Sequence, residues 1–155
     1  MKLSQIRLMA LEAHGSQMYG EEPYEYHLQH VAGNVAEIAQ RIGGDKSLQM
    51  LARSVAWLHD ILEDTSRTKE DLIQAGVPFS IVAAVDLLTR KEGTSHQRYL
   101  MNIVVADGLV GKLAWLVKVA DTATNLQHST MELNKKRVKK YTSQLQYLMV
   151  NSQWV

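Results

Sequence analysis

The chain has 155 residues, which fits one domain large enough to bury roughly 68–70% of the surface that the unfolded chain exposes. Its 17 basic and 16 acidic residues nearly cancel, so no overall field attracts nucleic acid or a membrane surface, and we expect neither as a partner. Disulfides, thiolate zinc sites and cysteine nucleophiles are excluded because cysteine is absent, and the lack of a membrane-spanning run or a signal-peptide pattern predicts a cytoplasmic protein.

Helical spacing of apolar residues recurs along the chain, whereas the alternation typical of strands is scarce. Over 28–42 the apolar side chains follow the i, i+3, i+4, i+7 rule, and Gly43-Gly44 ends the pattern. A second helix is expected over about 47–62. The segment 68–71 is a capping-box signal for a short helix that ends at Gly76, and Pro78 suits the first turn of the helix that follows.

Three more helices are expected in the second half of the chain. They cover about 95–106, 111–126 and 131–150, with a loop at 91–94 and a break at Asp107-Gly108. No repeat and no low-complexity linker divides the chain. We therefore predict an all-α fold in which residues 1–155 form a single domain.

Histidine and aspartate recur in an order that suits a divalent metal. His27 precedes or opens the first of these helices, His59 and Asp60 lie near the end of the second, and Asp121 lies on the helix over 111–126. Separate rigid helices can fix the geometry of a metal site between them. His59 and Asp60 diverge by about 100° on a helix, so both reach one ion only near the edge between their faces. Such ligands suit manganese, iron, zinc or magnesium.

The competing interpretation is that these histidines are ordinary helix residues. We prefer that interpretation for the four remaining histidines, which are His14, His30, His96 and His128. For the His59-Asp60 pair alone the two interpretations are equally good. Leu58 and Ile61 draw this pair into an apolar interior, where unpaired imidazole and carboxylate groups are costly without an ion. That cost favours a metal.

Two more carboxylates, Glu63 and Asp64, follow His59 and Asp60 by one helical turn and share their faces. The alternative, an acidic surface cluster at a helix C-terminus, would oppose the helix dipole. A carboxylate beside a metal-bound water can orient or deprotonate that water. The pair therefore predicts acid–base chemistry.

Candidate phosphate-binding residues lie further along the chain. Asn125 follows Asp121 by four residues, and a substrate contact and a plain helix-terminal amide explain it equally well. The basic run 135–140 is mostly a solvated helix face, from which one or two side chains could reach a phosphate.

These motifs together resemble a known family. The order of histidine, His-Asp and late aspartate resembles the HD-domain metal-dependent phosphohydrolases. The finer pattern resembles the hydrolase domains of RelA/SpoT proteins and the small stand-alone ppGpp hydrolases, and it runs over about 10–141. The matching segments are GEEPYEYH at 20–27, LHDILEDT at 58–65, VKVAD at 117–121 with Asn125-Leu126, and RVKKY at 137–141.

The resemblance implies a single HD-domain helical bundle with a metal site between its helices. The ligands it implies for one divalent ion, typically Mn²⁺, are His27, His59, Asp60 and Asp121. It makes Glu63 and Asp64 the catalytic acid–base pair. It gives substrate contacts to Asn125, Arg137 and Tyr141, while Lys118 also matches and has either a substrate role or a structural one.

The function that the resemblance implies is metal-dependent removal of the 3′-diphosphate from guanosine tetraphosphate (ppGpp), with no synthetase domain expected beside the hydrolase. The usual basic pair near the N-terminus is replaced here by Met18 and Tyr19, which puts ppGpp specificity in question. One alternative is the same fold acting on another phosphorylated nucleotide or cofactor. A second is a non-catalytic, metal-containing nucleotide-binding module. A homo-oligomer is left open.

Overall fold

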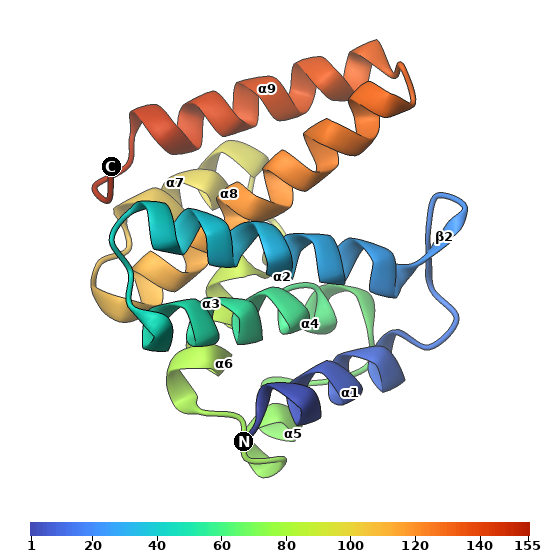
Figure 1. Ribbon diagram of the computed structural model, residues 1–155, viewed down its shortest axis with the longest axis vertical. Helices are drawn as coiled ribbons and strands as arrows, with labels where there is room; N and C mark the ends of the chain where they lie inside the picture. The colour runs from blue at the N-terminus through green and yellow to red at the C-terminus, as the bar shows by residue number, and fades with distance from the viewer.

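The computed structural model describes residues 1–155, and it is built from nine α helices and one short antiparallel ribbon (Figure 1). The all-α prediction is therefore confirmed. The helices are α1 (Leu3–His14), α2 (Tyr24–Arg41), α3 (Lys46–Leu58), α4 (Ile61–Asp64), α5 (Lys69–Gln74), α6 (Phe79–Leu88), α7 (His96–Val105), α8 (Gly108–Met131) and α9 (Lys135–Val150). The ribbon pairs β1 (Met18–Tyr19) with β2 (Glu22–Pro23).

Helix α8 is the central element of the bundle, because it contacts α2, α3, α6, α7 and α9. The stretch from Leu113 to Val117 is buried at every position, as expected for a helix surrounded by others. Trp115 ties α8 to the last helix, since its indole Nε1 donates to the backbone oxygen of Leu148 at 2.9 Å. Figure 1 shows α9 along one side of this core and α1 with α5 on the opposite side.

The prediction of one helix over 47–62 is wrong, because the structure divides this segment into α3 and α4 at His59 and Asp60. Asp60 has φ −102° and ψ 0°, which lies in the bridge region between helix and strand. The imidazole Nδ1 of His59 donates to the backbone oxygen of Ala56 at 2.7 Å. In an unbroken helix that oxygen would accept from the amide of Asp60, so the side chain competes with the helix at this point.

Other boundaries differ by a few residues. Helix α8 begins at Gly108 and continues to Met131, beyond the expected 111–126, and α9 begins at Lys135 rather than near 131. Leu133 separates them with φ 54°, a left-handed conformation that ends a helix. No helix in this fold combines the length and the apolar character that crossing a membrane requires.

The start of α8 depends on a missing side chain at Gly111. A β-carbon there would lie 2.1 Å from the backbone oxygen of Ala106, so the chain leading into α8 would have to move. We expect Gly111→Ala to lower the free energy of unfolding by about 1–3 kcal/mol, the usual cost of overpacking. The measurement is chemical denaturation followed by circular dichroism.

Gly33 in α2 is the matched control, because a β-carbon there meets nothing within 4 Å. Gly33→Ala should stabilise the protein by roughly 0.5–1 kcal/mol through the better helix propensity of alanine. If the two variants behaved alike, close approach at Gly111 would not limit stability.

Candidate metal centre and active-site pocket

Three side chains from two parts of the fold form a group that could hold a metal ion. His27 comes from the first turn of α2, and His59 with Asp60 comes from the junction of α3 and α4. A ligand atom from each lies within 4.8 Å of the others. Both histidines are buried, with exposed fractions of 2% and 4%. The break after Leu58 lets the neighbouring His59 and Asp60 side chains point at one place, which an unbroken helix would resist.

Asp121 joins this group from the middle of α8. Its Oδ1 lies 3.1 Å from Nε2 of His27 and 3.5 Å from Nε2 of His59. On the other side, Oδ2 of Asp60 lies 2.9 Å from Nε2 of His59 and 3.9 Å from Nε2 of His27. The structure therefore brings together all four residues predicted as metal ligands.

The atoms of this group are arranged so that a cation stabilises them. Because Nδ1 of His59 donates to a backbone carbonyl, a neutral ring carries its lone pair at Nε2. That nitrogen is buried, makes no hydrogen bond and faces the carboxylates of Asp60 and Asp121. Burial disfavours a charged imidazole, but Asp60 and Asp121 outweigh burial and raise the pKa of His59 well above its usual value.

A proton or a metal ion can satisfy these electron-rich atoms, and the donor set fits a divalent cation. Nitrogen and oxygen donors without thiolate suit borderline and hard ions. His59 also has the support usual for a metal-binding histidine, a carbonyl that fixes its tautomer. His27 lacks that support, because its Nδ1 is buried without a hydrogen-bond partner. Its ring instead stacks on Tyr19, with ring centroids 4.5 Å apart.

A layer of polar side chains holds the two aspartates in place. The hydroxyl of Tyr24 donates to Oδ2 of Asp60 at 2.5 Å, and burial together with the Asp60 charge raises the pKa of Tyr24. The ammonium group of Lys118 donates to Oδ2 of Asp121 at 3.1 Å, and the amide of Asn125 donates to its Oδ1 at 3.0 Å. Sequence reasoning missed Tyr24, although it precedes His27 by three residues and so shares its helix face.

Lys118 is half-buried, with 15% of its side chain exposed. Burial alone would lower its pKa, but the attraction of Asp121 is stronger and raises the pKa of Lys118. The lysine therefore keeps its charge and neutralises one of the two carboxylates. This contact gives Lys118 a structural role at the site, one of the two roles that the sequence left open.

Glu63 and Asp64 lie at the end of α4, beside the metal group. Oε1 of Glu63 accepts from the backbone amide of Arg90 at 2.8 Å. Oδ2 of Asp64 accepts from the side-chain amide of Gln17 at 2.9 Å, and Gln17 in turn contacts Nδ1 of His14 at 2.7 Å. Each carboxylate is thus anchored through one oxygen and keeps the other for further contacts.

One pocket of about 260 Å³ contains these groups. Its lining includes Tyr19, Tyr24, His27, Asp60, Glu63, Asp64, His96, Lys118, Asp121, Asn125, Lys140, Tyr141 and Gln144. The predicted substrate residues Asn125 and Tyr141 are among them. Arg137, in the first turn of α9, does not line the pocket. Its side chain is 56% exposed, and its guanidinium lies 3.7 Å from the carboxylate of Glu132.

Besides Tyr24, sequence reasoning missed His96, Lys140 and Gln144, which also line this pocket. Lys140, one turn after Arg137, brings a cation to the lining. His96 also lines it, although the sequence favoured an ordinary structural role for this histidine. The only signal for Lys140 was its place in the basic run before Tyr141, and nothing near His96 in sequence marked it out.

The sequence matches no model of a known protein family and no curated protein. The fold, in contrast, is similar to a solved structure. That structure is described as a metazoan ortholog of SpoT that hydrolyses ppGpp and plays a role in starvation responses. The TM-score is 0.69 at 22% sequence identity, over 96% of this chain and 84% of that chain. This chain therefore shares its fold with that ppGpp-hydrolysing protein, as the sequence motifs predicted.

The metal group makes a direct prediction about binding. We expect the protein to bind one Mn²⁺ per chain. A free Mn²⁺ concentration of 100 times Kd should raise the free energy of unfolding by about 2.7 kcal/mol. Asp60→Asn replaces a charged oxygen ligand by a neutral amide. This variant should lose more Mn²⁺ affinity than the roughly 10- to 100-fold lost when a residue that only hydrogen-bonds a metal ligand is removed. Isothermal titration calorimetry and thermal melting measure both effects.

Asp107→Asn is the control, because Asp107 is exposed and its side chain makes no capping hydrogen bond. It should bind Mn²⁺ like the wild type. Equal affinity in Asp60→Asn and the wild type would remove Asp60 from the ligand set.

Proposed function

We propose that this protein is a Mn²⁺-dependent phosphohydrolase that acts on a phosphorylated nucleotide, with ppGpp as the first candidate. The observation that carries the proposal is one pocket lined both by three of the four metal-ligand candidates, His27, Asp60 and Asp121, and by a separate pair of carboxylates. A purely structural metal site has no need of Glu63 and Asp64 beside it. The shared fold with a ppGpp hydrolase supports the choice of substrate class.

The positions of the side chains support a role for each. His27, His59, Asp60 and Asp121 would hold the ion, which when bound would polarise a phosphate oxygen and acidify a water molecule. Glu63 and Asp64 would orient the attacking water and take its proton, because each has an oxygen not used by its anchor. Tyr141 and Lys140 extend from α9 into the pocket and position the substrate phosphates.

The substrate side also shows why another nucleotide is the main alternative. Met18 is 54% exposed and supplies no charge. The hydroxyl of Tyr19 donates to Oδ1 of Asn125 at 2.6 Å, and the amide of Asn125 donates to Asp121. Asn125 is thus engaged on both sides by the protein. A nucleotide that does not depend on an N-terminal basic pair is therefore the main alternative to ppGpp.

The test is turnover of a nucleotide panel by the Mn²⁺-loaded protein. The panel contains ppGpp, nucleoside monophosphates and a phosphorylated dinucleotide, with released phosphate and diphosphate as the readout. We expect release that stops when EDTA removes the metal. Turnover of another nucleotide without turnover of ppGpp would replace the substrate and keep the reaction class. No turnover of any nucleotide with metal bound would favour the binding module.

The acid–base pair gives a sharper prediction. Glu63→Gln and Asp64→Asn should each lower kcat on the preferred nucleotide by roughly 100-fold or more, because each removes a group that handles a proton. Bound Mn²⁺, measured by elemental analysis, should stay at the wild-type level, since neither residue belongs to the metal group. Glu70→Gln, an exposed position on α5, is the control and should keep full activity.

Loss of metal in either variant would make that residue a ligand instead. Full activity in both variants with metal still bound would end the acid–base assignment.

A further inference from the structure

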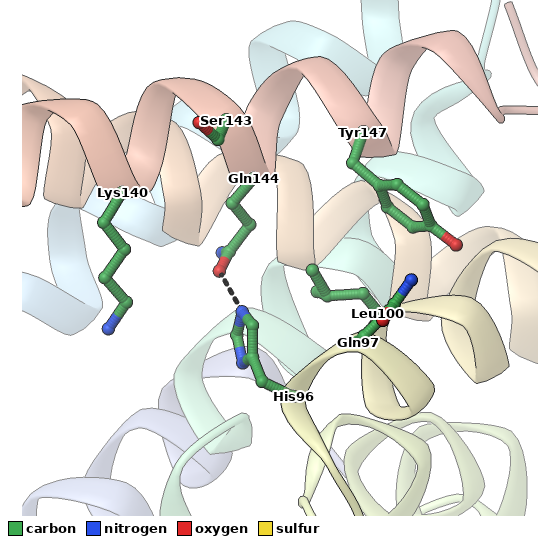
Figure 2. A pocket seen from close by; sticks show the side chains of 7 residues that line it. All are labelled: His96, Gln97, Leu100, Lys140, Ser143, Gln144 and Tyr147. Carbon is green, nitrogen blue, oxygen red and sulfur yellow. Dashed lines mark hydrogen bonds between the residues drawn. The ribbon is translucent and has the colours of Figure 1, made fainter.

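A second pocket of about 350 Å³ lies between α7 and α9 (Figure 2) and is next to the pocket lined by the metal-ligand candidates, here called the metal-ligand pocket. On the α7 side it is lined by Gln97 and Leu100, and on the α9 side by Ser143 and Tyr147. Figure 2 shows side chains from the two helices facing each other across this space. None of these four residues lines the metal-ligand pocket.

The two pockets form one cleft, because three residues line both of them. These shared residues are His96, Lys140 and Gln144. The metal-ligand pocket, at about 260 Å³, is smaller than the roughly 300–1,000 Å³ usual for a site that buries a drug-sized ligand. The cleft as a whole falls within that range. A substrate whose phosphate lies at the metal therefore has room to continue towards α7 and α9.

The opposite side of the metal offers no such room. Tyr19 packs against His27 and also against His128, with ring centroids 4.5 Å and 4.8 Å apart. Its hydroxyl is hydrogen-bonded to Asn125, so the ring is fixed between α2 and α8. The space beyond Tyr19 has a volume of only about 40 Å³. The part of a substrate that is not phosphate cannot lie there.

Hydrogen bonds connect three helices and fix the wall between the two parts of the cleft. The hydroxyl of Thr122 donates its proton to the backbone oxygen of Lys118 at 2.7 Å. The hydroxyl oxygen of Thr122 can therefore only accept from the side-chain amide nitrogen Nε2 of Gln144, at 2.5 Å. The carbonyl of Gln144 therefore faces His96, whose Nε2 must donate to it at 3.0 Å. These hydrogen bonds hold the wall rigid. In the neutral ring of His96 the other nitrogen, Nδ1, is left as a hydrogen-bond acceptor.

The lining of the second pocket suits a neutral, planar, hydrogen-bonding group. Leu100 and the ring of Tyr147 supply apolar surface, while the amide of Gln97 and the hydroxyl of Ser143 can donate and accept. The pocket contains no carboxylate, and its one cation, Lys140, lies where it meets the metal-ligand pocket. A nucleobase in this pocket would place its sugar and phosphates beside Lys140 and the metal ligands.

We propose that the pocket between α7 and α9 binds the nucleobase of the substrate, an inference that rests on the proposed nucleotide hydrolysis. The base then lies against α9, on the side of the metal opposite Tyr19. His96, Lys140 and Gln144, which line both pockets, lie between the base and the phosphate.

The test fills the pocket and compares substrates with and without a base. Ser143→Trp places a large ring at an exposed wall position, and Thr142→Trp places the same ring at a neighbouring exposed position that lines neither pocket. The probes are the nucleotide panel and bis(p-nitrophenyl) phosphate, which has no nucleobase. All proteins are loaded with Mn²⁺ and checked for folding by thermal melting.

We expect Ser143→Trp to raise KM for the nucleotides at least tenfold. Its loss of kcat/KM on nucleotides should exceed its loss on bis(p-nitrophenyl) phosphate by tenfold or more. Thr142→Trp should keep the wild-type ratio between the two kinds of substrate. Gln97→Ala, on the facing helix, should raise the nucleotide KM by roughly threefold to tenfold through one lost hydrogen bond.

Equal losses on both kinds of substrate, or an unchanged nucleotide KM in Ser143→Trp and Gln97→Ala, would overturn the base site while leaving the hydrolase activity in place. If the wild type hydrolyses bis(p-nitrophenyl) phosphate but no nucleotide, the base site is also wrong. If it hydrolyses no phosphate ester at all, the proposed function fails and this inference fails with it.

Discussion

The meeting of two aspartates with two buried histidines is the constraint on which the rest of the site depends. Asp60, which is half-buried, lies at the junction of α3 and α4, and the buried Asp121 lies in α8. Both carboxylates approach the same imidazole nitrogens within 2.9–3.9 Å. Without positive charge between them, these groups would repel one another in a poorly hydrated place. Lys118 compensates one carboxylate, and the remaining charge is what a divalent ion would neutralise. The helices around this point must therefore hold their positions closely, and α8 does so by packing against five others.

The same requirement explains the interruption between α3 and α4. A continuous helix would turn His59 and Asp60 about 100° apart, whereas the bridge conformation at Asp60 brings both side chains to the ion site. The interruption also starts α4, which carries Glu63 and Asp64 to the edge of the same pocket. The bridge conformation at Asp60 thus positions two candidate metal ligands, His59 and Asp60, and both candidate acid–base groups.

The surroundings of the metal group are asymmetric, and this asymmetry bears on substrate choice. Tyr19 fills the side next to α2, where its ring lies on His27 and its hydroxyl bonds to Asn125. On the other side, α7 and α9 leave an open cleft lined by neutral polar and apolar groups, with Lys140 at its narrow part. The proposed base site beside α9 is consistent with the absence of charge at Met18 and Tyr19, because it places the base on the other side of the metal-ligand candidates.

The amino-acid sequence alone determined the helical class, because the 3.6-residue spacing over 28–42 and 111–126 reflects burial that any packing of these helices requires. It also determined the set of residues that converge, since His27, His59-Asp60 and Asp121 have few other reasons to share an apolar interior. Only the tertiary structure decided where α3 ends, that Tyr24 holds Asp60, and that His96 and Lys140 line the pocket while Arg137 does not. These outcomes depend on contacts between distant segments: His96 and Gln144, for example, are 48 residues apart and meet because α7 and α9 both pack against α8. Local spacing carries no information about such pairs, because it describes one helix face and not which other helix covers it.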